Sequence, residues 1–267
     1  MTSLSLLNQG RSCLIHNRPR HAFTVTAGEG CYLWDDEGRR YLDFASGATG
    51  NLLGHRHPRL AQVVIDAAQG LQAAPARAYH LPEVQLATWL ADHSFADRVL
   101  LCRDGFEARA AAIALSVEYR QLREETRDEV IVPTPEGMEE PVRIFVPGVT
   151  VRRVRYGDAA AVAEVLGPRT NAVVVAPLSR AGGIHVPPNR YMTDIRALCD
   201  AARALLIIDE SRIAPGRTGS HVFAHQASGV RPDMLVLGHS LAAGDPFGVV
   251  LLREELARGA GESLVGY

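Results

Sequence analysis

Two neighbouring carboxylates, Asp209 and Glu210, follow a run of four apolar residues at positions 205–208. An apolar run without polar alternation is typical of a strand inside a parallel sheet, because both of its faces are covered. Ligands of open α/β sheets bind beyond the carboxyl ends of such strands, so these acids could perform acid–base chemistry or bind a ligand. An acid in this place can equally be the N-cap of the next helix. The pattern alone leaves both interpretations open.

A second candidate site begins with Arg103, Asp104 and Gly105, which lie between a predicted strand at 97–102 and an alanine-rich helical segment. A strand, a glycine turn and a helix N-terminus can together hold an anion on backbone N–H groups. The carboxylate of Asp104 would repel such an anion. Like charges about 4 Å apart repel by about 4 kcal/mol at an effective dielectric constant of about 20.

The sequence contains no lysine, so all 28 basic side chains counted as lysine and arginine are arginine. No side chain of this sequence can therefore act as an amine nucleophile.

Composition narrows the class of protein. The chain has 267 residues, of which 47% are hydrophobic and 22% are charged, and its formal net charge is −2. No strongly basic tract or membrane-length apolar run occurs, and the first residues do not resemble a signal peptide. We therefore expect a globular protein with no nucleic-acid or membrane partner.

The cysteines and histidines do not form a recognisable metal or disulfide pattern. The four cysteines, at positions 13, 31, 102 and 199, are widely spaced, which favours a reducing, cytoplasmic setting. His55 and His57 lie two residues apart beside Pro58, with no third ligand close in sequence. We predict that they form the entry to a helix and that the chain has no metal site.

Strand and helix patterns alternate along most of the chain, which predicts an α/β fold with a mostly parallel sheet flanked by helices. Strands are predicted near 97–102, 130–132, 142–146, 150–156, 172–177, 205–208, 233–238 and 248–252, and helices at 58–70, 82–93, 158–166 and 190–203. Aromatic-rich segments on either side of the turn at 35–38 predict a small N-terminal β-hairpin. We place an N-terminal segment at 1–57 and the large domain at 58–267.

Several of these stretches resemble the class III aminotransferases, pyridoxal-phosphate enzymes of fold type I, and most closely the acetylornithine/succinylornithine branch. The matching stretches occur in family order and are GRRYLDF at 38–44, LGHRHP at 53–58, SFADRV at 94–99, LLIIDE at 205–210, GRTG at 216–219, PDML at 232–235 and LAAGDPFG at 241–248. The resemblance implies the fold-type-I large domain, with a mostly parallel, seven-stranded sheet flanked by helices. It also implies that Asp209 is the acid that pairs with the cofactor's pyridine nitrogen.

The resemblance fails where the family carries its cofactor lysine, because that position is His239. An imidazole cannot form the aldimine through which the family's lysine holds the cofactor. The sequence therefore predicts neither transamination nor bound pyridoxal phosphate, whether covalent or non-covalent.

Other family positions have changed as well. Asp104 replaces the serine of the family's phosphate turn, Arg180 stands in the altered segment 176–183, and Arg212 follows the strand acids. The family's ring-stacking segment has no match between 129 and 150. Because the sequence ends at Tyr267, we expect the family's C-terminal small domain to be missing.

Two hypotheses about function follow. In the first, the chain has a repurposed, cofactor-independent site for a small amino- or keto-acid-like ligand. Such a protein would act in specialised biosynthesis. Asp209 and His239 are then the candidate catalytic residues, since histidine has a reference pKa of about 6.5. The candidate ligand-binding residues are Arg103, Asp104, Gly105, Arg180 and Arg212.

In the second hypothesis the chain is a non-catalytic pseudoenzyme. It would act as a homodimer, or as the partner, scaffold or regulator of a full-length aminotransferase in a heterodimer. A third interpretation, a remnant of a truncated gene, is disfavoured by the intact caps, turns and strand patterns.

Overall fold

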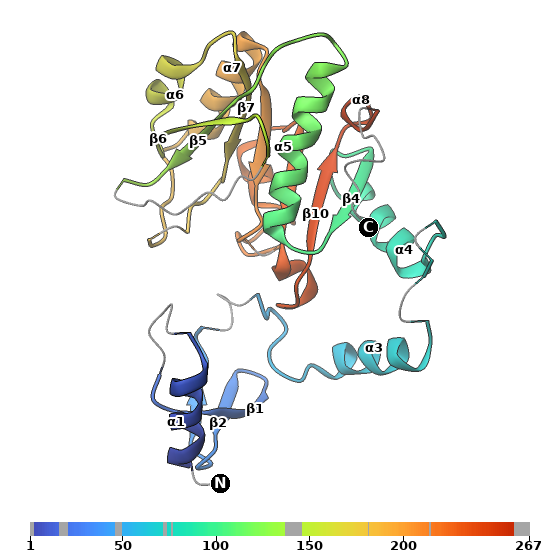
Figure 1. Cartoon of the computed structure of the whole chain (residues 1–267), viewed down its shortest axis with the longest axis vertical. Helices are drawn as coiled ribbons and strands as arrows, with labels where there is room; N and C mark the ends of the chain where they lie inside the picture. Colours follow the sequence, from blue (N-terminus) through green and yellow to red (C-terminus); the bar gives the residue numbers. More distant parts are fainter. Residues whose placement is uncertain are drawn as a thin grey trace. The chain divides into compact units, whose positions relative to one another are not determined.

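The computed structural model describes residues 3–15, 21–45, 50–71, 74–75, 77–136, 146–180, 182–213 and 215–258. The chain forms two compact units, Met1–Ala73 and Ala74–Tyr267 (Figure 1). The predicted boundary at residues 57 and 58 lies before a helix that groups with the first unit, and the assignment of domains stays a prediction. In the described part of the chain, no helix is both long and apolar enough to cross a membrane.

The first unit contains a three-stranded antiparallel sheet in the order β1-β2-β3. Its elements are α1 (Ser3–Cys13), β1 (Val25–Glu29), β2 (Tyr32–Asp35), β3 (Arg40–Leu42) and α3 (Pro58–Gln69). The predicted hairpin is present as β2 and β3, and β1 adds a third strand. Helix α1 was not predicted.

The turn between β2 and β3 is held by Asp35. Its carboxylate accepts hydrogen bonds from the backbone N–H groups of Glu37 and Arg39 and from the side chains of Arg39 and Tyr41. Burial of this carboxyl group acts to raise its pKa, but these hydrogen bonds outweigh it and lower the pKa well below its usual range. The acidic turn is therefore a structural feature of the hairpin.

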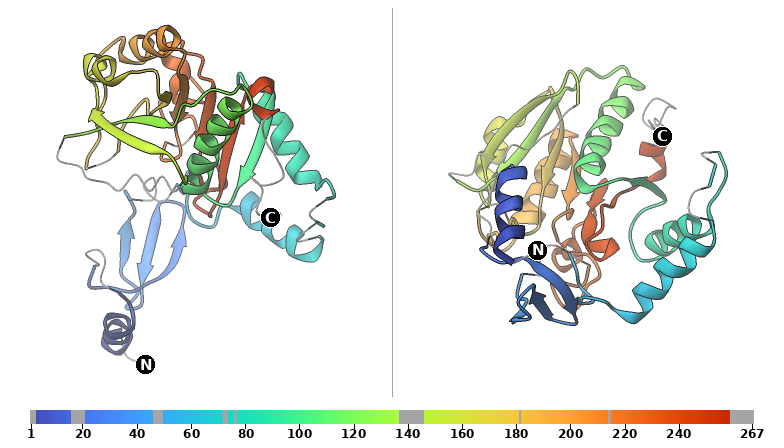
Figure 2. Two further views of the ribbon diagram at one scale, coloured as in Figure 1. Left: turned by 45° about the horizontal axis from the view of Figure 1, so that its top comes forward. Right: turned by 60° about the horizontal axis from the view of Figure 1, so that its bottom comes forward.

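The second unit is built on a seven-stranded sheet in the order β4-β10-β9-β8-β7-β5-β6. The strands are β4 (Arg98–Cys102), β5 (Glu129–Thr134), β6 (Thr150–Arg155), β7 (Thr170–Val175), β8 (Leu205–Asp209), β9 (Met234–Leu237) and β10 (Gly248–Leu252). β10 pairs antiparallel with β4 and with β9, and the other four strand pairs of this sheet are parallel, which confirms the mostly parallel sheet. Figure 2 shows this sheet from two further directions.

The strands predicted near 130–132 and 150–156 are present as β5 and β6. β5 is buried along most of its length, because β6 and β7 pair with both of its sides and the two cores cover its faces. β6 lies at one edge of the sheet, and β4 lies at the other. The strand predicted at 142–146 falls largely on residues 137–145, outside the described residues.

Helices cover both faces of the sheet. They are α4 (Leu81–Asp92), α5 (Gly105–Gln121), α6 (Ala159–Val165), α7 (Tyr191–Ala202), α8 (Glu254–Ala257) and the short 3-10 helices η1 (Ala224–Ser228) and η2 (His239–Ala242). Helix α5 packs along the sheet with one set of core residues, whereas α4, α6 and α7 contribute to the other set (Figure 1).

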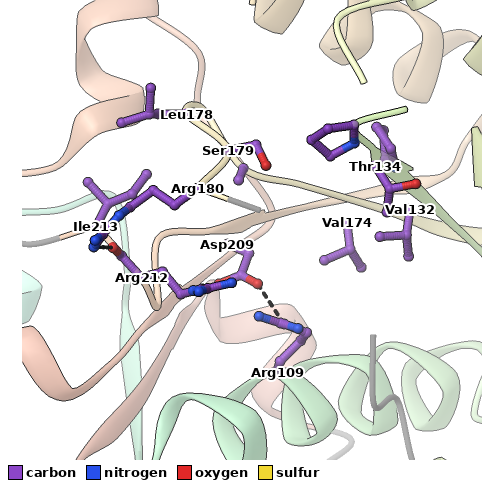
Figure 3. Close-up of a pocket in the computed structure, with 13 residues that line it drawn as sticks. Arg109, Val132, Thr134, Val174, Leu178, Ser179, Arg180, Asp209, Arg212 and Ile213 are labelled. Atoms are coloured by element: carbon purple, nitrogen blue, oxygen red, sulfur yellow. Dashed lines mark hydrogen bonds and ion pairs between the residues drawn. The ribbon is translucent and has the colours of Figure 1, made fainter. Parts of the chain in front are cut away.

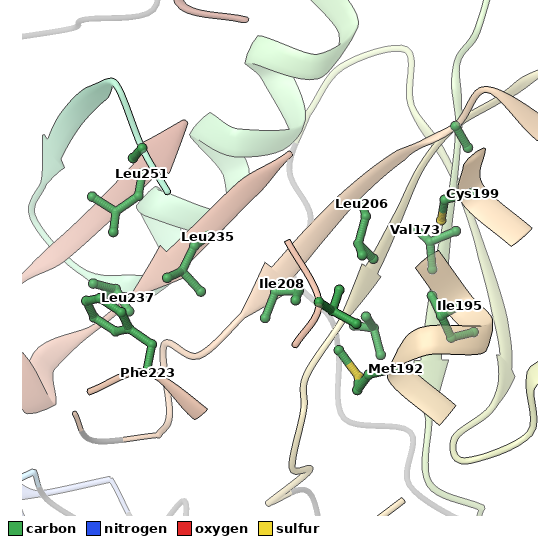
Figure 4. Packing of buried hydrophobic residues seen from close by; sticks show 14 of the residues in the cluster. Val173, Met192, Ile195, Cys199, Leu206, Ile208, Phe223, Leu235, Leu237 and Leu251 are labelled. Carbon is green, nitrogen blue, oxygen red and sulfur yellow. The ribbon is translucent and has the colours of Figure 1, made fainter. Parts of the chain in front are cut away.

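Strand β8 illustrates why its sequence shows no polar alternation. Leu206 and Ile208 face the core that contains α7 residues such as Ile195 (Figure 4), while Leu205 and Ile207 face the core of α5. Successive side chains of a strand point to opposite faces, so a strand covered on both sides is apolar throughout. The predicted central parallel strand is confirmed, because β8 is the fourth of seven strands.

Three glycines let backbone segments approach one another where α5 begins. A Cβ atom on Gly105 would lie 2.8 Å from Cβ of Ser211. A Cβ atom on Gly238 would overlap the carbonyl group of Ser211, and one on Gly248 would overlap the carbonyl group of Asp104. These approaches fix the start of α5 against the ends of β8, β9 and β10.

We expect Gly238→Ala to lower the free energy of unfolding by more than about 1 kcal/mol, because the added methyl group forces the backbone of Ser211 to move. Urea unfolding measures the change. The control is Gly167→Ala, where a Cβ atom meets nothing within 4 Å and the change should stay within about 0.5 kcal/mol. Equal stability of the two variants would contradict this account.

Candidate functional site

A pocket lies at the carboxyl ends of β5, β7 and β8, where the sequence placed the ligand crevice (Figure 3). Its cavity has a volume of about 90 Å³. The lining residues are Arg109, Val132, Pro133, Thr134, Pro135, Val174, Ala176, Leu178, Ser179, Arg180, Asp209, Arg212 and Ile213. Apolar side chains form much of the wall, and the charged groups are three arginines and one aspartate.

Asp209 enters this pocket as half of an ion pair with Arg109 of α5. The Nε atom of Arg109 lies 2.6 Å from Oδ2 of Asp209, and the two side chains are only 13% and 12% exposed. The other carboxylate oxygen of Asp209 accepts a hydrogen bond from the backbone N–H of Ser211 at 2.9 Å. Both oxygens of the acid are therefore engaged.

Arg109 is a site residue that sequence reasoning missed. It lies 100 positions before Asp209 in the chain, so no local spacing connects the two. One signal was present: Arg109 adds a cation to the segment that the resemblance matches to the family's phosphate turn. Because the resemblance matches both Arg109 and Asp209 to cofactor-contacting segments, it would have indicated that these two opposite charges lie close together.

Glu210 has a different role, although it is adjacent in sequence. It is 1% exposed and accepts hydrogen bonds from the backbone N–H groups of Ala224 and His225, at 2.7 and 2.8 Å. Nδ1 of His225 lies 2.8 Å from the same carboxylate. Glu210 thus binds the start of η1, while Asp209 lines the pocket. The N-cap interpretation does not apply to Glu210, because the N-cap of η1 is Phe223 and Glu210 lies well before this helix in the chain.

Arg180 follows β7 and Arg212 follows β8, and in Figure 3 the side chain of Arg212 extends towards Asp209. Nη1 of Arg180 donates a hydrogen bond to the backbone carbonyl of Arg212 at 3.0 Å. Burial, and then the guanidinium groups of Arg217 and Arg212, lower the pKa of Arg180. A positive charge held among other positive charges is a binding element for an anion.

Arg103, Asp104 and Gly105 do not line this pocket. Asp104 is the N-cap of α5, and its Oδ1 accepts hydrogen bonds from the backbone N–H groups of Phe106 and Glu107, both at 2.8 Å. Arg103 is 70% exposed at its side chain and lies 3.5 Å from Glu107. The carboxylate predicted to repel an anion therefore occupies the helix N-terminus itself. A ligand-binding role for these three residues stays a prediction.

His239 is the first residue of η2, and Gly238 separates it from the end of β9. Its side chain lies outside the described part of the structure, so its role as a catalytic group stays a prediction. The histidines of the other motif are placed: His55 lies 2.8 Å from Asp43 and 3.1 Å from Asn51. Among the described residues, no group of three or more potential metal ligands occurs.

Comparison with known proteins gives the family. The sequence profile of the aminotransferase class-III family matches residues 15–137 and 151–263. The chain belongs to this family. Acetylornithine aminotransferase of Methanothermobacter thermautotrophicus is 32% identical, with 96% of this chain and 68% of that protein covered. Succinylornithine transaminase of Citrobacter koseri is 34% identical, with 88% and 61% covered.

Solved structures of this family have the same fold. Acetylornithine aminotransferase of Elizabethkingia anophelis has a TM-score of 0.87 at 25% identity, covering 100% of this chain and 68% of that one. An ornithine aminotransferase of Toxoplasma gondii has a TM-score of 0.88 at 26% identity, covering 100% and 66%. The fold-type-I prediction is confirmed. The chain spans about three fifths to two thirds of the length of these class-III relatives.

The family assignment corrects the prediction that no cofactor binds. The relatives are aminotransferases, and the Toxoplasma gondii structure is described with pyridoxal phosphate at its active site, so the family points to this cofactor. The prediction was wrong because it treated loss of the attaching lysine as loss of binding. Covalent attachment and non-covalent contacts are separate contributions to affinity.

The described residues, as arranged, do not fit pyridoxal phosphate in the way implied by the family resemblance. The N–H groups of Phe106 and Glu107, at the turn expected to hold the phosphate, are bonded to Asp104. The acid expected to meet the pyridine nitrogen, Asp209, is paired with Arg109. The cavity of about 90 Å³ is also below the roughly 300–1,000 Å³ of typical ligand pockets.

We expect Asp104→Ala to lower the free energy of unfolding by about 0.5–2 kcal/mol, whereas Asp104→Asn should retain most of it, since asparagine is an equally good N-cap. Chemical denaturation of both variants measures this difference. If alanine and asparagine are equally destabilising, the charge of Asp104 matters more than its hydrogen bonds, and the capping role is refuted.

Proposed function

We propose that this class-III aminotransferase relative does not transaminate with a lysine of its own and that its pocket binds a small amino- or keto-acid-like anion. The observation that carries the proposal is the excess of positive charge at the carboxyl ends of β5, β7 and β8. Arg109, Arg180 and Arg212 line the pocket with Asp209 as the only acid among the described lining residues. Guanidinium groups are well suited to bind carboxylates.

The absence of lysine supports the first half of the proposal. Transamination through an enzyme-bound aldimine needs a side-chain amine, and the 267 residues contain none. The family resemblance places His239 at the position of that amine. Asp209 and His239 are then the candidate acid–base groups, and Arg180 and Arg212 are the candidate carboxylate-binding groups. A reducing, cytoplasmic setting is part of the proposal, in keeping with four free cysteines.

We expect a panel of amino acids and 2-oxo acids to include ligands that raise the unfolding temperature, because ligands that bind only the folded state stabilise it. In a parallel assay with pyridoxal phosphate, an amino donor and a keto acceptor, the chain should transfer no amino group above the rate of the free cofactor. Stabilisation by no member of the panel would refute the binding site. Turnover that is lost in His239→Ala would refute the claim that the chain does not transaminate.

A second candidate function is that of a subunit in a homodimer or in a heterodimer with a full-length aminotransferase. Helix α3 favours it, because none of its residues is buried and its consecutive apolar side chains Val63, Val64 and Ile65 are 62%, 58% and 48% exposed. Apolar surface of this kind is characteristic of interaction sites.

Native mass determination at micromolar concentration, with and without a full-length class-III aminotransferase, should detect a dimer. Val64→Glu should weaken the dimer, because a charge would be buried in an apolar contact. Leu122→Glu is the matched control, since Leu122 is 68% exposed but lies outside α3. A monomer under both conditions would exclude the partner function.

A further inference from the structure

We propose that two carboxylates of the chain, those of Asp104 and Glu107, are internal anions that occupy the N-terminus of α5 in place of a phosphate group. The phosphate of pyridoxal phosphate then adds no affinity at this turn, and the chain binds phosphorylated and unphosphorylated forms of the cofactor equally well. The inference goes beyond the proposed function, because Asp104 and Glu107 do not line the pocket.

The N–H groups at the start of α5 are bonded to these two side chains. The N-terminus of a helix of 17 residues ordinarily offers such groups to an anion. Oδ1 of Asp104 instead accepts hydrogen bonds from the N–H groups of Phe106 and Glu107, both at 2.8 Å. Oε2 of Glu107 accepts one from the N–H of Arg103 at 2.6 Å. A phosphate would have to displace a carboxylate to use any of these donors.

The turn is also negatively charged. The side chain of Arg103 lies 3.5 Å from Glu107 but is 70% exposed, so water screens its charge. The thiol of Cys102 shows the effect of the two acids: burial, and then the carboxylates of Glu107 and Asp104, raise its pKa to about 12. These charges disfavour a thiolate because it is an anion, and they disfavour a phosphate for the same reason.

Neighbouring segments hold the backbone of the turn in place. A Cβ atom on Gly105 would lie 2.8 Å from Cβ of Ser211, and one on Gly248 would overlap the carbonyl group of Asp104. Gly248 also pairs with Cys102 at the end of β4. Because the segments after β8 and at the start of β10 lie this close, the backbone has little room to move away from a phosphate. Room for a phosphate therefore depends mainly on the side chain of Asp104.

The test measures dissociation constants for pyridoxamine phosphate and pyridoxamine by isothermal titration calorimetry. Neither probe carries an aldehyde, so neither reacts with the terminal amine of the chain. The ratio of the two constants isolates the contribution of the phosphate, because the probes are otherwise identical. Asp104→Gly removes the charge and the competing oxygen, and glycine is tolerated at an N-cap. Asp104→Asn removes the charge but keeps an oxygen for the two N–H groups.

Asp158 supplies the matched control, since it is the N-cap of α6 and its Oδ1 accepts a hydrogen bond from the N–H of Ala161 at 3.0 Å. Asp158→Gly removes a cap of the same kind at another helix. It should change the ratio of the two constants by less than about twofold. Circular dichroism checks that each variant is folded. If Asp104→Gly does not fold, Asp104→Asn carries the test, because asparagine is as good an N-cap as aspartate.

We expect the wild-type chain to bind the two probes within about twofold of each other, because the phosphate meets carboxylates instead of free donors. Asp104→Gly should bind pyridoxamine phosphate about tenfold or more tightly than pyridoxamine, since two N–H donors become free for a charged group. Asp104→Asn should show a preference of about threefold, because it removes a partly screened charge but leaves the donors occupied. Adding Glu107→Gln to Asp104→Gly should increase the preference further.

A preference of about tenfold or more for pyridoxamine phosphate in the wild-type chain would overturn the inference, because the phosphate would then be bound despite the carboxylates. Equal binding of the two probes by the folded variant that carries the test would overturn it as well, and so would no binding of pyridoxamine phosphate by that variant. If the wild-type chain binds neither probe, measurable binding of pyridoxamine phosphate by the variant is the expected gain. None of these outcomes bears on the proposed function, which the panel of amino acids and 2-oxo acids tests separately.

Discussion

The structure depends on the burial of β8 on both faces. Side chains of consecutive residues must point to opposite sides of the sheet, so the end of this strand sends Asp209 towards α5 and Glu210 towards η1. One acid becomes part of a pocket, and the other holds the segment that begins at Ala224. The alternation of side chains along the strand thus places Asp209 in the pocket and Glu210 in the structural contact with η1.

The charges around this point balance each other locally. Arg109 neutralises Asp209, and Asp104 satisfies the first N–H groups of α5. Glycines at 105, 238 and 248 bring these segments within contact. The pocket is therefore completed by side chains of the chain itself at positions where the class-III family resemblance would place cofactor contacts. The family assignment points to pyridoxal phosphate, and these internal contacts occupy groups that the resemblance would assign to that cofactor.

Much of the fold was predictable because hydrophobic periodicity is local. The strand at 205–208, its place in a parallel sheet and the site at its carboxyl end follow from the apolar run and the acids after it. The pairing of Arg109 with Asp209 was not predictable in the same way, because it joins elements 100 positions apart. Asp104 was interpreted as a repelling charge because its hydrogen bonds to α5 depend on backbone geometry. The prediction that no cofactor binds was wrong because it was based on the absence of the attaching lysine. That absence gives no information about non-covalent contacts with the cofactor.

The antiparallel pair of β4 and β10 joins residues 98–102 to residues 248–252. During synthesis at about 5–20 residues per second, the roughly 150 residues between them take about 8–30 s to emerge. Throughout that time α5, which packs on β10, has no complete surface to cover. Several of its buried side chains are small, among them Ala108, Ala112 and Ser116. Because these side chains are small, α5 exposes less apolar surface to other nascent chains, before β10 has emerged, than a helix with larger apolar side chains at these positions would.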